Sequence, residues 1–364
     1  MGFCISAQER LFFTTLTTRD GLPNASVSII VQDKQGFLWF GTQNGLARYD
    51  GYTFKVYENE AFLDNVLSHN QVQTLFLDDD ILWIGIYGGL NRLELKTDTI
   101  TSYKHEENND YSISSNLIVS ICRDSKGSLL IGTSVGLDHF DEVSGNFYHY
   151  IQPNNAQGLP SCMIRDIHCD KEGELWIATS GQGLWKYDYV SDSFSIVSSG
   201  ISSKSSLSFQ YVMSISEDSK GTLWFGTWFG GISRLIDRST YQFETIKLDD
   251  KRVYFVYAQV EGKILAGTWG GGLFLYDTEA KTVSRYITTD ELCPFPNNVA
   301  YSAYLDINDV LWIGTNGGGV AHTQKQDIQY VMYEAHDRKP GSLPLGRVTA
   351  IAEDATGSLW VAVV

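Results

Sequence analysis

The sequence has few basic residues and no long apolar run. Of its 364 residues, 27 are Lys or Arg and 43 are Asp or Glu, which gives a net charge of −16. Nucleic-acid binding depends on basic patches that neutralise phosphates, so we expect no nucleic-acid partner. No apolar stretch approaches the roughly 20 residues that a membrane-spanning helix needs.

Motifs for metals, cofactors and catalysis are also missing. The five cysteines show neither CxxC nor metal-ligand spacing, and the seven histidines show no HExxH. There is no phosphate loop, dinucleotide fingerprint or histidine-kinase motif. Residues 132–136 match G-x-S-x-G, but they follow a short strand in a repeated loop and not a strand-to-helix turn. We therefore expect no metal, no cofactor and no enzyme activity in this segment.

What the sequence does contain is a short phrase repeated eight times. Clear copies read DKQGFLWFGT (33–42), DSKGSLLIGT (124–133), DKEGELWIAT (170–179), DSKGTLWFGT (218–227) and DINDVLWIGT (306–315). The anchor positions, spaced 44, 47, 46, 48, 41, 47 and 48 residues apart, are Trp39, Trp83, Leu130, Trp176, Trp224, Leu265, Trp312 and Trp360. This period is typical of a β-propeller with four short strands per blade. The anchors are predicted to pack between adjacent blades.

The first unit shows how one blade is built. Residues 27–31 are predicted as strand a, 37–41 as strand b, 46–49 as strand c and 54–57 as strand d. Asp33 and Gly36 favour a tight turn between strands a and b. Asp50-Gly51 is a hairpin dipeptide between strands c and d.

The predicted fold is all-β: a seven-bladed propeller of four-stranded antiparallel blades, followed by the start of a second propeller. Seven blades close if residues 12–16 complete the blade of Trp312, which leaves no free sheet edge. An eight-bladed ring is the alternative. The predicted division is a leader remnant at 1–10, the first propeller at 11–324 and a truncated second propeller at 325–364. Ser6-Ala7-Gln8 resembles the end of a secretory signal, which favours export over a cytoplasmic start.

A ligand site is predicted where the loops between strands b and c meet those between strands d and a. Two residues after the strand-b glycine, the b–c loops vary from blade to blade, and glycines surround the variable residue. The candidate ligand-binding residues are Gln43, Tyr87, Trp228, Phe229, Trp269, Asn316, Lys251 and Arg252. Trp228 and Trp269 favour stacking against a sugar, although they could instead plug the channel. Lys251 and Arg252 suit an anionic group or are plain surface charge.

The phrase GLPNASVSIIVQDKQGFLWFGTQNGLARYDGYTFKVY (21–57) closely resembles the opening of two-component regulator propellers. These are the periplasmic sensor regions of bacterial hybrid two-component histidine kinases, and of some receptors that end in diguanylate cyclase modules. The resemblance implies two consecutive seven-bladed propellers, an immunoglobulin-like domain, a membrane helix and a kinase. Many members look like sensors of polysaccharide breakdown products. Since the chain stops inside a strand, we expect it to be a fragment of such a receptor.

The leading hypothesis is therefore a periplasmic ligand-sensing propeller that binds an oligosaccharide or similar nutrient and controls a downstream kinase. The expected partners are the small-molecule ligand, the chain's own C-terminal propeller, the membrane-linked kinase region and, as an open alternative, a second copy in a homodimer. A free-standing propeller for protein interaction is the second hypothesis. A propeller lyase or glycosidase is the third, and it would need acid and base groups converging on one mouth of the channel.

Overall fold

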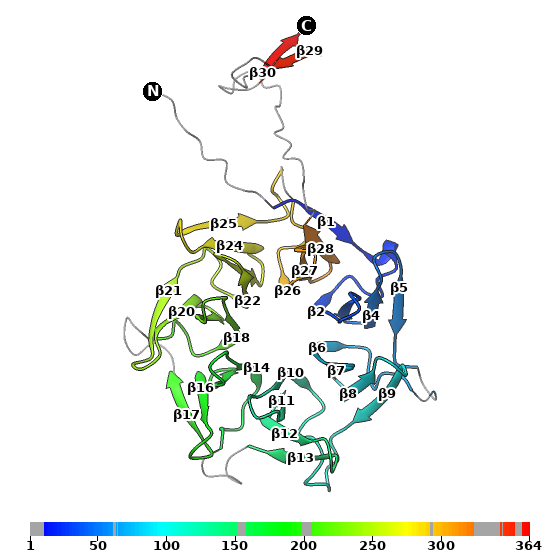
Figure 1. Cartoon of the computed structure of the whole chain (residues 1–364), viewed down its shortest axis with the longest axis vertical. Helices are drawn as coiled ribbons and strands as arrows, with labels where there is room; N and C mark the ends of the chain where they lie inside the picture. The colour runs from blue at the N-terminus through cyan, green and yellow to red at the C-terminus, as the bar shows by residue number, and fades with distance from the viewer. Residues whose placement is uncertain are drawn as a thin grey trace. The chain divides into compact units, whose positions relative to one another are not determined.

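The computed structural model describes residues 11–60, 63, 65–150, 158–198, 206–291, 294–323, 343, 345–353 and 359–364. The chain divides into two compact units, residues 1–324 and 325–364. The first unit contains seven four-stranded antiparallel sheets, arranged as blades around a central channel (Figure 1). The only helix among the described residues is the short 3-10 helix η1 (Thr18–Asp20). The all-β, seven-bladed prediction is confirmed.

Each blade runs from strand a at the channel to strand d at the rim. Blade 1 holds β2 (Val27–Gln32), β3 (Leu38–Thr42), β4 (Gly45–Tyr49) and β5 (Phe54–Tyr57). Blade 2 holds β6 (Val72–Asp78), β7 (Ile81–Ile86), β8 (Gly89–Glu94) and β9 (Thr99–Tyr103). Blade 3 holds β10 (Ile118–Arg123), β11 (Leu129–Thr133), β12 (Leu137–Asp141) and β13 (Asn146–His149). Blade 4 holds β14 (Ile164–Cys169), β15 (Leu175–Thr179), β16 (Leu184–Asp188) and β17 (Ser193–Ser198).

The remaining blades follow the same order. Blade 5 holds β18 (Val212–Glu217), β19 (Leu223–Thr227), β20 (Gly231–Asp237) and β21 (Gln242–Ile246). Blade 6 holds β22 (Val253–Val260), β23 (Lys263–Thr268), β24 (Leu273–Asp277) and β25 (Thr282–Tyr286). Blade 7 holds β26 (Ala300–Leu305), β27 (Leu311–Thr315) and β28 (Val320–Thr323), and β1 (Phe13–Leu16) is its fourth strand.

Strand β1 closes the ring from the opposite end of the unit. It pairs antiparallel with β28, from Phe13 opposite Thr323 to Leu16 opposite Val320. Figure 1 shows β1 beside β28, at the junction of the first and last blades. This pairing excludes the eight-bladed alternative. It also covers the sheet edge of blade 7, which would otherwise be open to pairing with another chain.

The repeated Asp at the turn between strands a and b accepts three hydrogen bonds. In blade 1, one carboxylate oxygen of Asp33 accepts from the backbone N–H of Gln35 (2.9 Å) and Phe37 (3.0 Å). The other oxygen accepts from the indole N–H of Trp39 at 2.8 Å. The same Asp–Trp bond, six residues apart, recurs in blades 4, 5 and 7 at 2.8, 3.0 and 2.9 Å. The Asp thus fixes both the turn and the ring orientation of the anchor.

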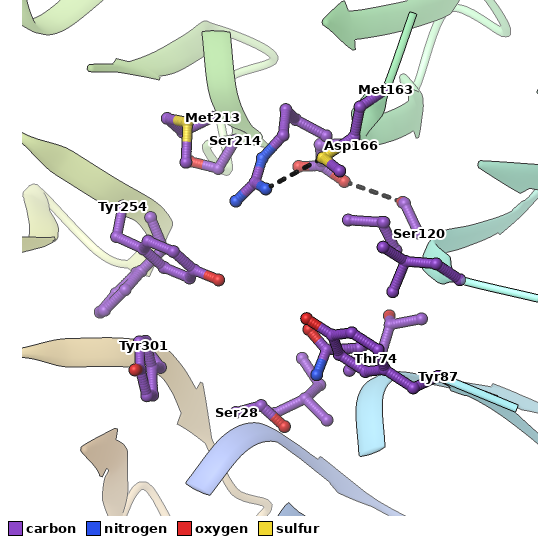
Figure 2. Close-up of a pocket in the computed structure, with 16 residues that line it drawn as sticks. Ser28, Thr74, Tyr87, Ser120, Met163, Asp166, Met213, Ser214, Tyr254 and Tyr301 are labelled. Carbon is purple, nitrogen blue, oxygen red and sulfur yellow. Dashed lines mark hydrogen bonds between the residues drawn. The ribbon is translucent and has the colours of Figure 1, made fainter. Parts of the chain in front are cut away.

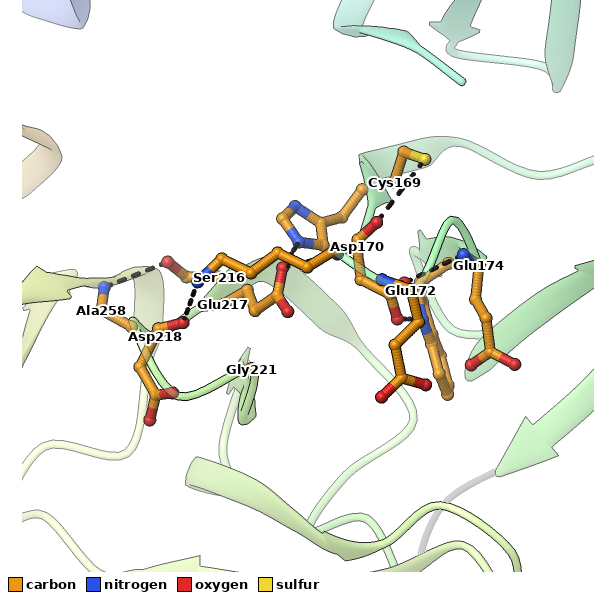
Figure 3. A network of polar contacts seen from close by, with 12 residues as sticks. Cys169, Asp170, Glu172, Glu174, Ser216, Glu217, Asp218, Gly221 and Ala258 are labelled. Carbon is orange, nitrogen blue, oxygen red and sulfur yellow. Dashed lines mark hydrogen bonds and ion pairs between the residues drawn. The ribbon is translucent and has the colours of Figure 1, made fainter. Parts of the chain in front are cut away.

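Blade 4 adds an ion pair to this arrangement. Arg238 places a guanidinium nitrogen 2.7 Å from the Asp170 carboxylate oxygen that also accepts from Trp176. Burial alone would raise the pKa of Asp170, but the hydrogen bonds and charge of Arg238 and the indole bond hold that pKa below its usual range. Figure 3 shows the turns of blades 4 and 5 side by side, with Asp170 and Glu217 in adjacent positions.

Each anchor joins a cluster with the next blade. Trp39, for example, is 1% exposed and packs with Val72, Leu75 and Leu82 of blade 2. Seven such clusters run round the ring, one at each blade junction, anchored by Trp39, Trp83, Leu130, Trp176, Trp224, Leu265 and Trp312. The hydrophobic core is therefore a series of inter-blade layers.

The Gly and Thr that end the repeated phrase also have structural roles near the blade junctions. A Cβ on Gly41 would lie 2.6 Å from the side chains of Ile29 and of Val72 in the next blade, so only glycine fits without a shift. The hydroxyl of Thr42, which is fully buried, donates to the carbonyl of Gly45 at 2.8 Å and closes the b–c loop. The same bond recurs in five further blades.

The second unit contains one described hairpin, β29 (Val348–Glu353) paired with β30 (Leu359–Val363). Its register shifts between Val348 and Ala350, as the strand a–b pairs of the propeller also do. Trp360 is 67% exposed, unlike the buried anchors of the first unit. The start of a second propeller stays a prediction, and the proposed leader at 1–10 lies outside the described residues.

Blade 3 contains a buried ion-pairing site away from the channel. The Nδ1 atom of His149 lies 2.8 Å from a carboxylate oxygen of Asp138, a fully buried residue. The other oxygen accepts from the backbone N–H of Ser114 at 2.8 Å. The hydrogen bond to Asp138 raises the pKa of His149 above its usual value, although burial acts in the opposite direction.

We predict that Asp33→Asn lowers the free energy of unfolding by about 1–3 kcal/mol. One of the two accepting carboxylate oxygens would be replaced by an NH₂ group, which cannot accept a hydrogen bond from the N–H that faces it. Asp79→Asn is the matched control. Asp79 has φ of 53°, which Asn tolerates, and its side chain is 82% exposed. Its effect should stay within about 0.5 kcal/mol. Denaturant titration followed by tryptophan fluorescence compares the two variants, and equal effects would refute the assigned role of Asp33.

We predict that His149→Gln destabilises the propeller more at about pH 5.5 than at about pH 8. Because the folded-state pKa of His149 is raised, its stabilisation is complete below the unfolded value near 6.5 and is lost as pH rises through the folded value. Thermal unfolding of both proteins across this pH range measures the difference. A gap in midpoint that widens toward high pH would contradict the assignment.

Candidate functional site

The channel is lined by strand a of every blade, which carries a β-bulge at the same place. In each strand a the register shifts between its first and third residues, as between Ile164 and Asp166 in β14. A bulge turns two successive side chains toward one side of the sheet. The second and third residues of strand a line a channel cavity of about 190 Å³. The residues around this cavity are Ser28, Ile29, Gln73, Thr74, Tyr87, Leu117, Val119, Ser120, Met163, Arg165, Asp166, Met213, Ser214, Tyr254, Phe255 and Tyr301. Figure 2 shows Tyr254 and Tyr301 across the open channel from Tyr87 and Ser120.

A second cavity, of about 220 Å³, lies at the mouth on the b–c loop face. It is lined by Ser28, Gln43, Gln71, Gln73, Tyr87, Tyr254, Trp269 and Tyr301. Five of these residues also line the deeper cavity, so the two spaces adjoin. The structure therefore brings three predicted site residues, Gln43, Tyr87 and Trp269, together at one mouth.

Aromatic rings form a continuous cluster on one side of this mouth. The ring centroid of Trp269 lies 5.9 Å from that of Tyr254 and 5.8 Å from that of Tyr301. Trp228 meets Trp269 edge-on at 5.8 Å, but it does not line either cavity. Burial raises the pKa of Tyr301 to about 12, so its hydroxyl stays protonated and can donate a hydrogen bond.

The other predicted residues lie outside the two cavities. Asn316 accepts a hydrogen bond from the Ser26 hydroxyl at 3.0 Å. Lys251 is exposed in its d–a loop. Arg252 forms two hydrogen bonds with Asp250, at 3.0 and 2.7 Å. Burial acts to raise the pKa of Asp250, but the bonds and charge of Arg252 hold it below its usual range. The charge of Arg252 is therefore already balanced within the chain.

Phe229 adopts a backbone conformation that is unfavourable for a bulky residue. Its φ is 82°, whereas the equivalent positions in three other blades are glycines: Gly181, Gly270 and Gly317, with φ of 91°, 129° and 88°. The ring is 54% exposed and contacts Phe209 edge-on at 5.7 Å. Such strain costs about 1–3 kcal/mol and is found mainly at functional sites.

Residues that sequence reasoning missed belong to strand a. Tyr254, Tyr301 and Arg165 occupy the second position of their strands, next to the first apolar residue. The signal is that this position varies between blades, from Ser28 and Gln73 to the two tyrosines, while the residue before it stays apolar. The described residues hold no group of three or more His, Cys, Asp or Glu that could bind a metal. They also include no helix long and apolar enough to cross a bilayer.

We predict that Phe229→Gly raises the midpoint of thermal unfolding. Relief of about 1–3 kcal/mol of backbone strain outweighs the entropic cost of glycine, about 0.5–1 kcal/mol. Gly317→Ala is the mirror control, because an added Cβ would meet only Asn297, at 3.9 Å, and so introduces strain alone. It should lower the midpoint. If Phe229→Gly lowered it as well, the Phe229 ring would be stabilising the fold and the strain argument would be wrong.

A family model described as the two-component regulator propeller matches this chain at residues 21–44, 112–134, 158–181, 206–229 and 294–317. These segments cover strands a and b of blades 1, 3, 4, 5 and 7, the blades whose a–b turn begins with the repeated Asp. Histidine kinase P4 of Formosa agariphila is 47% identical over 60 residues, which are 16% of this chain and 4% of the kinase.

Solved structures share the fold. An extracellular domain from B. thetaiotaomicron, described as part of a hybrid two-component system, superposes with a TM-score of 0.79 and 23% identity. The match covers 97% of this chain and 47% of that domain, so the chain spans about half its length. Virginiamycin B lyase from Staphylococcus aureus has a TM-score of 0.62 and 14% identity over 86% of this chain and 99% of the lyase. The chain is thus similar to two-component regulator propellers: the family model matches five of its seven blades, and the seven blades form one closed ring.

Proposed function

We propose that this propeller is the ligand-binding part of an extracytoplasmic sensor and that it binds the end of an oligosaccharide at the channel mouth. The observation that carries the proposal is the mouth cavity itself, where Trp269, Tyr254 and Tyr301 stand beside the amides of Gln43 and Gln71. Aromatic faces suit the apolar faces of sugar rings, and a few placed polar groups select their hydroxyls. The match of five blades to the two-component regulator propeller model supports a sensory role.

The size of the site favours a terminal sugar unit over a long chain. The two adjoining cavities measure about 190 and 220 Å³. Even together they stay near the lower end of the range of about 300–1,000 Å³ that is usual for ligand pockets, which suits one or two sugar rings. Binding of one or two sugar rings at the mouth would stabilise one arrangement of the receptor's domains over another and so bias the downstream kinase. The C-terminal propeller, the membrane-linked kinase region and a second receptor copy are the proposed partners in that step.

A hydrolase or lyase function has less support. Acid–base catalysis of glycosidic cleavage commonly uses two carboxyl groups. Among the described residues that line the two cavities, Asp166 is the only carboxylic acid and there is no histidine. The likeness to virginiamycin B lyase, at 14% identity, shows the fold alone.

We predict that replacing both Trp228 and Trp269 by Ala weakens binding of an oligosaccharide by about tenfold or more, since burial of one large aromatic contact contributes about 1.5–3 kcal/mol. Calorimetric titration of the chain with neutral and acidic oligosaccharides measures the affinity. Trp360→Ala is the control, because Trp360 is exposed in the second unit. Unchanged affinity in the double variant would remove the mouth as the binding site.

A further inference from the structure

Arg165 is the only cation among the described residues that line the two channel cavities. It is the second residue of β14, at the bulge that turns both Arg165 and Asp166 toward the channel. The guanidinium carbon lies 5.6 Å from the ring centroid of Tyr254, which belongs to blade 6. Arg165 therefore reaches from blade 4 toward the aromatic side of the channel, below the mouth.

The guanidinium of Arg165 has no carboxylate partner among the described residues, unlike most of the protein's other partly buried arginines. Its Nε atom is buried and has no hydrogen-bond partner, and one terminal nitrogen donates only to the sulfur of Met163, at 3.5 Å. No described carboxylate forms an ion pair with it. By contrast, Arg123, Arg238 and Arg252 each pair with at least one carboxylate. A partly desolvated charge without a counter-charge is costly, so the site calls for an anionic partner.

The neighbouring Asp166 does not supply that partner. One carboxyl oxygen accepts from the Ser120 hydroxyl at 3.2 Å and from the backbone N–H of Ile167 at 2.9 Å. The other accepts from the backbone N–H of Ile215 in blade 5 at 2.8 Å. Asp166 thus links three successive blades by hydrogen bonds. The hydroxyl oxygen of Ser214 similarly links blade 5 to blade 6, by accepting from the backbone N–H of Val256. Burial raises the pKa of Asp166, which further weakens it as a counter-charge.

We propose that Arg165 binds an anionic group on the terminal sugar of the ligand, so that the sensor recognises an acidic oligosaccharide. The planar fork of a guanidinium matches the two oxygens of a carboxylate or sulfate. The sugar ring would lie against Tyr254 and Tyr301, while its acidic group reaches down the channel to Arg165. This inference rests on the proposed function, because it assigns the chemical class of the ligand at the same mouth.

Because the protein is acidic overall, binding of an anionic ligand would depend on the positive charge of Arg165 in the cavity. At a net charge of −16, the protein as a whole repels anions, so an acidic ligand needs a specific positive group within the cavity. Arg165 provides that group in a partly dry environment, where the attraction is stronger than in water. Binding should therefore weaken as ionic strength rises, but less steeply than for exposed charges.

The test is a calorimetric titration of the chain with three probes: a neutral galactose trisaccharide, the galacturonic acid trisaccharide and a sulfated galactose trisaccharide. The expected result is that an acidic probe binds at least tenfold more tightly than the neutral one, and that Arg165→Gln removes this preference. Arg165→Lys should retain part of it, since the charge is kept without the fork. Lys220→Gln, an exposed charge at an a–b turn on the opposite face, is the matched control. Thermal unfolding verifies that every variant is folded.

The outcomes separate this inference from the proposed function. Preference for the galacturonic acid or the sulfated probe identifies which acidic group is recognised, and either supports the role of Arg165 if Arg165→Gln abolishes it. Acidic and neutral probes that bind equally, or an acidic preference that survives Arg165→Gln, would overturn the inference. The oligosaccharide site would then still stand if the double tryptophan variant lost binding. If none of the three probes bound, both the inference and the oligosaccharide site would fall.

Discussion

In four of its seven blades, the structure depends on a single carboxylate at the a–b turn. By accepting two backbone N–H groups and an indole N–H, the Asp at the a–b turn locks the tight turn and sets the orientation of the anchor Trp. That Trp then packs on the next blade, so a local turn determines how neighbouring blades meet. Blade 2 shows the cost of omission: its a–b connection is a short hairpin without this Asp, and the buried indole nitrogen of Trp83 has no partner. Neither blade 2 nor blade 6, which lacks the turn as well, matches the family model.

The residues that hold the ring together differ from those that face the channel. Once β1 completes blade 7, every junction is filled by an anchor cluster, and the stability of the ring lies between the blades. The bulge in each strand a then turns its second side chain toward the channel, outside the anchor clusters that hold the blades together. These positions are free to differ, and they do: Ser28, Arg165 and Tyr254 are equivalent residues of three blades. The scaffold therefore presents a ring of variable side chains on fixed backbone.

Period and turn chemistry predicted the fold because they act locally. The strands of blade 1 lie within one residue of the ranges expected from alternation and from Asp33 and Gly36. Equivalent loop positions led to Gln43, Tyr87 and Trp269. The strand a residues were missed for a physical reason: strict alternation assigns only every second side chain to the channel, and the bulge breaks that alternation. The ion pair between Arg252 and Asp250 was not predicted, because an Asp in a loop is equally typical of a residue that caps the loop's own backbone.

Two features of the channel face oppose the stability of the fold. Phe229 holds a backbone conformation that glycine adopts in three other blades, and Arg165 holds a charge without a counter-charge. Three other blades carry glycine at the loop position of Phe229, and Arg123, Arg238 and Arg252 each pair with a carboxylate. Backbone strain and an unpaired charge both lower stability, so their presence at the channel face points to a role other than folding. In the proposed complex, the anionic group of the ligand would supply the counter-charge that Arg165 lacks.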